Sequence, residues 1–119
     1  MRKINLTDQF ARFTDHWNPR IAARLNGQMV KLVKFKGEFV WHHHEQEDEL
    51  FWVVKGRFRM EFCDRSEWIG EGEIIVIPRG VEHRPVAEEE CHIVLFEPES
   101  TLNTGNVRDA RTRDVLDTL

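Results

Sequence analysis

Short stretches in which apolar and polar residues alternate, each ending in a turn signal, fill the chain from residue 20 to residue 98. An alternation of period two is typical of β-strands that bury one face. Asn26-Gly27 separates two such stretches, and this dipeptide favours a tight hairpin because both central residues adopt positive φ angles. About eight short strands result from this pattern. It predicts an all-β fold, a small antiparallel sandwich or barrel.

The chain has 119 residues, enough for one domain with one hydrophobic core. We therefore expect a single domain over residues 1–119, with its strands in residues 20–98. A short N-terminal helix is predicted at residues 7–17, because the large apolar side chains there fall on one helical face. Asn18-Pro19 ends this predicted helix, since a residue before proline avoids the helical conformation. Residues 101–119 are expected to form a polar C-terminal tail.

Composition narrows the expected partners and location. Eight Phe and four Trp favour a folded core over disorder. The formal net charge of −4 makes nucleic acid and anionic membrane surfaces unexpected partners. No apolar run reaches the roughly 18 residues of a membrane span, and residues 1–10 lack the apolar centre of a signal peptide. We expect a cytoplasmic protein.

The segments on either side of Lys55-Gly56 predict a second hairpin with a two-residue turn. In that register one strand face is apolar except for a single carboxylate at its end. This face carries Glu49, Phe51, Val53, Phe58, Met60 and Phe62. Burial of an unpaired carboxylate is strongly destabilising, and a metal ion bound by Glu49 would compensate for it.

The opposite face of the first of these strands carries Leu50, Trp52 and Val54. Three large apolar side chains are not expected to stay in water as one patch. A partner subunit or the N-terminal helix would cover them. We therefore expect a homodimer formed through this face.

Three consecutive histidines precede these strands. On a strand, His42 and His44 project to one side and His43 to the other. Glu49 follows on the apolar face, and His83 lies near the start of a later strand. Three imidazoles and one carboxylate suit a divalent first-row transition metal, whereas closed structural zinc sites usually contain cysteine.

These residues occur in two stretches that resemble the two sequence motifs of the cupin superfamily. In the first, between Gly37 and Gly56, the pattern is a glycine, His-x-His, a glutamate and a second glycine. In the second, Gly72 is followed by Pro78-Arg79-Gly80 and then His83, with the expected spacing. Gly37 lies one residue closer to the histidines than is usual, and Ala87 stands where the second motif often ends in Asn.

The resemblance implies a small antiparallel β-barrel of the jelly-roll type, also called a double-stranded β-helix. It further implies one divalent transition metal in the barrel mouth: manganese, iron, nickel, zinc or copper. The implied metal ligands are His42, His44, Glu49 and His83. The chain is most similar to the short single-domain cupins (monocupins, cupin type 2) described as mannose-6-phosphate isomerase-like. The resemblance also favours a dimer.

Two alternatives concern the metal site. Some cupins bind no ion, so the four residues could form a polar patch in a metal-free barrel. Glu47 could replace Glu49 as the carboxylate. Glu49 is preferred because it lies on the apolar face, six residues before Gly56.

The expected function is that of a metal-dependent enzyme acting on an unidentified small molecule, of isomerase, dioxygenase, decarboxylase or cyclase type. Glu49 is the predicted catalytic residue, as a base if it leaves the metal. The absence of tyrosine argues against the cupin epimerases and thiol dioxygenases that use one. A non-catalytic ligand-binding or sensor protein is the alternative. Inward-facing side chains would line the barrel and shape a pocket: Val40, Phe51, Val53, Phe58, Met60 and Phe62.

Overall fold

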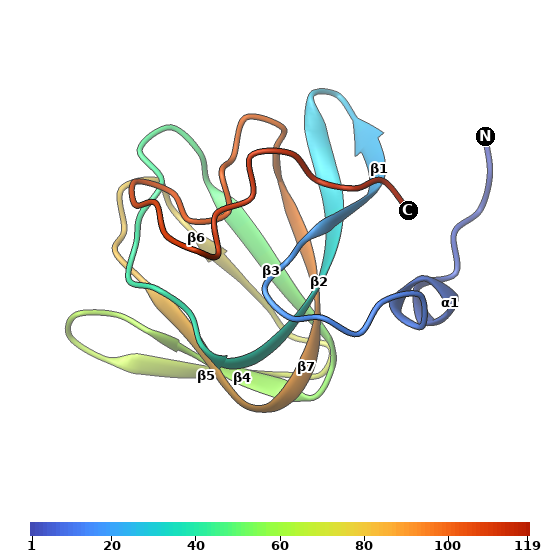
Figure 1. The fold of residues 1–119 in the computed structure, drawn as a ribbon. Helices are drawn as coiled ribbons and strands as arrows, with labels where there is room; N and C mark the ends of the chain where they lie inside the picture. Colours follow the sequence, from blue (N-terminus) through green and yellow to red (C-terminus); the bar gives the residue numbers. More distant parts are fainter.

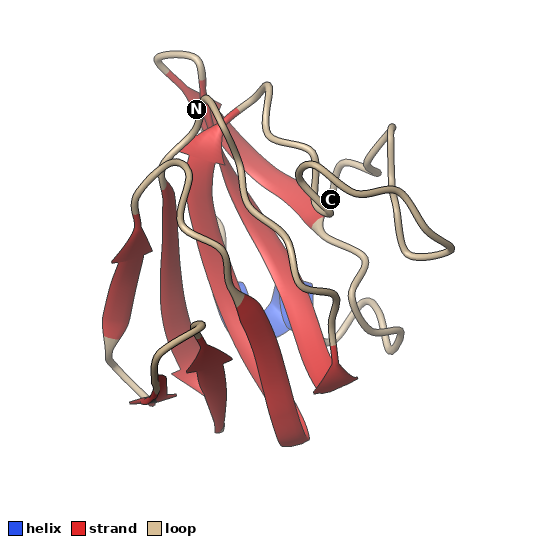
Figure 2. Cartoon of the chain, turned by 90° about the vertical axis from the view of Figure 1, so that its left-hand side faces the viewer, coloured by secondary structure: helices blue, strands red, loops and turns tan.

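Seven strands and one short helix are described by the computed structural model, which covers residues 1–119. Every pairing between strands is antiparallel, which confirms the predicted all-β class. Figure 1 shows the helix outside the strands, and Figure 2 shows long loops beyond the strand ends. In chain order the elements are α1 (Leu6–Phe10), β1 (Arg20–Leu25), β2 (Gln28–Glu38), β3 (Glu49–Lys55), β4 (Arg57–Glu61), β5 (Ser66–Gly70), β6 (Ile74–Ile77) and β7 (Arg84–Pro98).

Strand β7 organises the sheet, because it pairs with three other strands. The order along the sheet is β1-β2-β7-β3-β6, and β4 pairs with both β7 and β5. The first part of β7 pairs with β4 and the end of β2, while its second part pairs with β2 and β3. Strands β5 and β6 each pair with a single strand. The sheet is therefore not closed into the continuous barrel that the sequence suggested.

The hairpin at Asn26-Gly27 is confirmed, since β1 pairs with β2 there and the two residues have φ angles of +50° and +75°. The hairpin predicted at Lys55-Gly56 is wrong. Strand β3 pairs with β6 and β7, whereas β4 pairs with β5 and β7. Gly56 has a φ of +84°, and a Cβ atom there would lie 2.9 Å from the backbone oxygen of Glu90. At Gly56 the backbone thus passes close to β7, and β3 and β4 do not pair with each other as a hairpin would.

The acidic run Glu88–Glu90 lies exposed within the continuous strand β7. Glu90 pairs there with His16 at 2.8 Å and with His92 at 3.1 Å. The histidine segment between β2 and β3 forms no continuous strand, because β2 ends at Glu38 and an isolated bridge joins His42 to His83.

The helix is shorter than predicted, because the apolar residues of the N-terminal segment pack into two different clusters. Phe10 and Phe13 pack with Leu32 and Val94 on one side of the sheet. Trp17 belongs to the main core, where its ring stacks on Phe35 at a centroid distance of 4.4 Å. One helical face does not reach both clusters. The helix therefore ends at Phe10, and Trp17 adopts a φ of +60°.

The C-terminal tail returns to the start of the sheet. Backbone hydrogen bonds join Leu119 N to Ile21 O at 2.8 Å and Ile21 N to Asp117 O at 2.9 Å. Earlier in the tail, Asn106 N donates to His43 O at 3.0 Å. The tail thus lies against both β1 and the histidine segment. No helix is long and apolar enough to cross a membrane.

Phe58→Ala should lower the free energy of unfolding by about 3–5 kcal/mol, because Phe58 is fully buried in the main core and truncation leaves a cavity. Urea denaturation followed by far-UV circular dichroism measures the change. Val115→Ala is the control, since that side chain is exposed and its loss should change the free energy by less than about 0.5 kcal/mol. Equal effects of the two substitutions would contradict the described core.

Candidate metal centre

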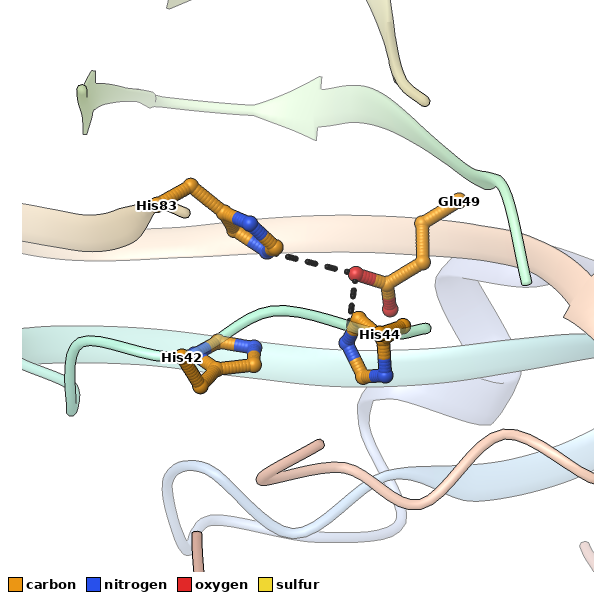
Figure 3. A group of neighbouring side chains, drawn as sticks. All are labelled: His42, His44, Glu49 and His83. Atoms are coloured by element: carbon orange, nitrogen blue, oxygen red, sulfur yellow. Dashed lines mark ion pairs between the residues drawn. The ribbon is translucent and has the colours of Figure 1, made fainter. Parts of the chain in front are cut away.

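Four buried side chains from distant parts of the chain point toward one another (Figure 3). His42 and His44 lie in the segment between β2 and β3, Glu49 is the first residue of β3, and His83 directly precedes β7. Two backbone hydrogen bonds join His42 and His83, from His42 N to His83 O at 3.0 Å and from His83 N to His42 O at 2.9 Å. This bridge brings the two sequence motifs together.

The four residues offer ligand atoms that all lie within 4.8 Å of one another. Glu49 Oε1 lies 2.9 Å from His44 Nε2 and 3.3 Å from His83 Nε2 (Figure 3). No more than 4% of any of the four residues is exposed. The structure thus brings together all four residues that the sequence analysis selected.

Backbone carbonyls orient two of the imidazoles. His42 Nδ1 lies 2.9 Å from Val40 O, and His83 Nδ1 lies 2.8 Å from Val81 O. A carbonyl oxygen only accepts hydrogen bonds, so Nδ1 carries the hydrogen in both rings. Each Nε2 is then left with a lone pair, which is the arrangement typical of metal-binding histidines.

Three of the clustered atoms are buried without a hydrogen-bond partner: His44 Nε2, Glu49 Oε1 and His83 Nε2. Buried polar atoms without partners are rare in folded proteins, because each loses its interaction with water. A cation placed among them would satisfy all three at once. Imidazole nitrogens with one carboxylate oxygen are a donor set that divalent first-row metals accept. The residues therefore fit a metal ion.

The surroundings shift the pKa values toward the protonation states that a cation requires. Burial, and secondarily the neighbouring His83, lower the pKa of His42 to about 4, so its ring is neutral at pH 7. Burial alone would raise the pKa of Glu49, but contacts with Glu97, His44 and His83 outweigh it and hold that pKa well below its usual value. A neutral imidazole and an ionised carboxylate are both ready to bind a metal.

The C-terminal tail supports the histidine segment from behind. His43 N donates a hydrogen bond to Asn106 Oδ1 at 2.8 Å. Gly105 has a φ of +58°, and a Cβ atom there would clash with the His43 carbonyl. The His43 side chain pairs with Glu82 at 3.0 Å. The contact between the C-terminal tail and the histidine segment was not predicted, because no local sequence pattern indicates where the tail packs.

A cavity of about 30 Å³ is lined by His42 and Glu49 of the cluster and is walled by aromatic rings. Trp17 stacks between Phe35 and Phe39, at centroid distances of 4.4 and 4.8 Å. Phe51 and Asn103 also line this cavity. Among the other residues expected to shape a pocket, Val53, Phe58 and Met60 have no exposed surface, while Val40 and Phe62 are partly buried against the core.

Two buried charged residues, of which Glu97 lines the cavity, were not predicted from the sequence. Lys31 and Glu97 form an ion pair with a distance of 2.8 Å between Nζ and Oε1, and each is 2% exposed. Burial and the carboxylate of Glu49 raise the pKa of Glu97 well above its usual value, although Lys31 opposes this. The sequence did contain a signal for Lys31: it lies two residues before the buried Val33 in β2, so both side chains project to the same inward face. The same alternation of inward-facing residues identified Glu49.

The antiparallel fold encloses a cluster of three histidines and one glutamate that could hold a metal ion, which defines a class of small β-proteins with a candidate metal site. The family model described as "Cupin domain" matches residues 29–97. The chain therefore belongs to the cupin family, which confirms the resemblance seen in the sequence.

Solved structures of similar proteins agree with this assignment. A cupin-2 domain containing protein from Shewanella frigidimarina is 48% identical, with a TM-score of 0.80 over 81% of this chain and 94% of that chain. Protein NMB1881 from Neisseria meningitidis is 37% identical, with a TM-score of 0.76 over 82% of this chain and all of that chain.

The uncharacterized protein YdbB from Bacillus subtilis is 36% identical over 63 residues. The match spans 52% of this chain and 56% of YdbB, so it covers only about half of that relative.

Lowering the pH from 6.5 to 4 should destabilise the cation-free protein in part through His42. Its pKa is lower in the folded state, so the unfolded state binds the extra proton in this window. Above pH 6.5 His42 is neutral in both states and costs no stability. As the pH falls toward 4, this effect lowers the free energy of unfolding by at most about 3 kcal/mol. Urea denaturation at several pH values, with chelator present, measures it. His42→Gln should show a flatter profile, and parallel profiles would contradict this account.

Proposed function

We propose that this protein binds one divalent transition metal per chain through His42, His44, Glu49 and His83, and acts as a metal-dependent enzyme on a small molecule. The observation that carries the proposal is the convergence of three buried, unpartnered ligand atoms on one point. Manganese, iron, nickel, zinc and copper all accept this donor set.

The chain's own residues suggest how such a centre would work. When bound, a divalent metal supplies Lewis-acid chemistry at the end of the cavity. His42 and His83 are held by backbone carbonyls, so they keep their orientation. Glu49 is the proposed catalytic residue, because it is the one carboxylate among the four and lines the cavity. The rings of Trp17 and Phe39 exclude water from that space.

A non-catalytic ligand-binding protein is the second candidate. It is favoured by the size of the cavity, since about 30 Å³ holds little more than one water molecule. A ligand of a few atoms fits such a space, whereas a larger substrate would need the cavity to widen. Screening the metal-loaded protein against small-molecule panels separates the two. Turnover supports the enzyme, and thermal stabilisation without turnover supports the binding protein.

His44→Ala should abolish stoichiometric metal binding, because it removes one of four ligands from a buried site. Elemental analysis of protein purified without a histidine tag should find about one transition metal per wild-type chain and almost none in the variant. Added metal should raise the melting temperature of the wild type only.

His92→Ala is the matched control, because His92 lies on β7 and stacks on Phe10, outside the four-residue cluster. It should keep its metal. A His44→Ala variant that binds one equivalent as tightly as the wild type would overturn the ligand assignment.

We further propose a homodimer formed through the outer face of β3. Trp52 is 41% exposed there, and its cross-strand neighbour Ile74 on strand β6 is 59% exposed. Leu50 pairs with Val76 on the same face, and Val76 is 52% exposed. Val54 is instead packed against the N-terminal cluster. Leu50, Trp52, Ile74 and Val76 are thus the apolar side chains left for a partner subunit.

Trp52→Glu should convert the dimer to a monomer, because it places a charge in the proposed apolar interface. Size-exclusion chromatography with light scattering measures the mass. Trp68→Glu is the control, since Trp68 is also exposed but lies on β5, and it should remain dimeric. A monomeric wild type would contradict the proposal. The single-domain organisation and the cytoplasmic location stay predictions.

A further inference from the structure

A buried ion pair lies directly behind the proposed metal centre. Lys31 in β2 and Glu97 in β7 are both 2% exposed, with Nζ 2.8 Å from Oε1. Lys31 Nζ also donates to Thr101 O at 3.4 Å. Lys31 is thus held by two partners, and it fixes one oxygen of the Glu97 carboxylate.

The other oxygen of Glu97 has no such partner. Glu97 Oε2 is buried without a hydrogen bond, and Glu97 lines the same cavity as His42 and Glu49. A purely structural ion pair would leave this free oxygen beside the cavity unexplained. Its situation matches that of the three unpartnered atoms of the four-residue cluster.

Sheet register places Glu97 opposite Glu49. Leu50 of β3 pairs with Phe96 of β7, so one step along each antiparallel strand sets Glu49 against Glu97. The Glu97 carboxyl group contacts Glu49 across the sheet. Because Lys31 holds Glu97 from the other side, the position of this contact is fixed. Lys31, Glu97 and Glu49 thus form one row of contacts that ends at the four ligand residues.

We propose that Glu97, held in place by Lys31, is a fifth member of the metal centre: a positioning residue that holds the Glu49 carboxylate. This inference rests on the proposed function, because it concerns how tightly the site holds its ion. Residues that contact metal ligands from behind typically change metal affinity by about 10–100-fold when they are replaced. Glu97 has that place in this fold.

Glu97→Gln tests the role with little change in shape. The amide oxygen can still accept from Lys31, while the carboxyl oxygen that faces Glu49 is replaced by an NH2 group. With Co²⁺ as the probe, followed by its visible absorption, we expect the Kd to rise by about 10–100-fold relative to the wild type. The absorption bands of the loaded variant should also shift, which a merely structural role would not cause. Glu99→Gln is the control, because Glu99 is exposed two residues away, and it should bind like the wild type.

A double variant, Lys31→Met with Glu97→Met, keeps the test decisive if the single variant does not fold. Apolar side chains of similar volume commonly replace a buried ion pair without loss of stability. This variant should also bind Co²⁺ at least tenfold more weakly. A folded variant of either kind that binds with the wild-type Kd and unchanged absorption bands would overturn the inference.

The same titrations separate this inference from the proposed function. If the wild type binds no Co²⁺, both are overturned. If the wild type binds and His44→Ala does not, the four-residue site stands. The Glu97 variants then decide the fifth member alone.

Discussion

The buried carboxylate of Glu49 is the interaction on which the centre depends. A carboxylate at 4% exposure is tolerated only where other groups stabilise its charge. His44 and His83 lie 2.9 and 3.3 Å from its Oε1 atom, and Glu97 stands opposite across the sheet. A cation bound among these groups would give each of them a partner. Without an ion, the buried atoms that lack a hydrogen-bond partner would destabilise the fold.

Strand β7 is what makes this arrangement possible. It is 15 residues long and pairs with β2, β3 and β4. His83 precedes it and Glu97 lies near its far end, while Lys31 and Glu49 lie on the two strands that flank its second part. One long strand therefore connects the histidine side of the centre to the ion pair behind it. The sheet can stay open at β5 and β6 without disturbing the site.

The walls of the cavity come from segments outside the two motifs. Trp17 enters from the N-terminal segment and donates its indole hydrogen to Lys36 O at 2.8 Å. Asn103, from the C-terminal tail, donates to Arg111 O and accepts from Arg113 N. The tail also holds the backbone of His43. These segments limit the size of the cavity, so they govern what can approach the four-residue cluster.

Sequence alone determined which residues face inward and which residue types meet at the centre. The alternation of Phe51, Val53, Phe58 and Met60 predicted a buried face, and all four are buried. The spacing of His42, His44, Glu49 and His83 predicted one cluster, which the structure forms. Both inferences use local patterns, because side chains two apart on a strand share a face.

Only the tertiary structure decided which strands are neighbours. The crossover at Gly56, the continuity of β7 through its acidic residues and the open sheet all depend on contacts between distant segments. The opposition of Glu49 and Glu97 likewise follows from the register of β3 on β7, between residues far apart in the chain. Alternation gives each strand its inner face, but partner and register are set by how all the inner faces pack together.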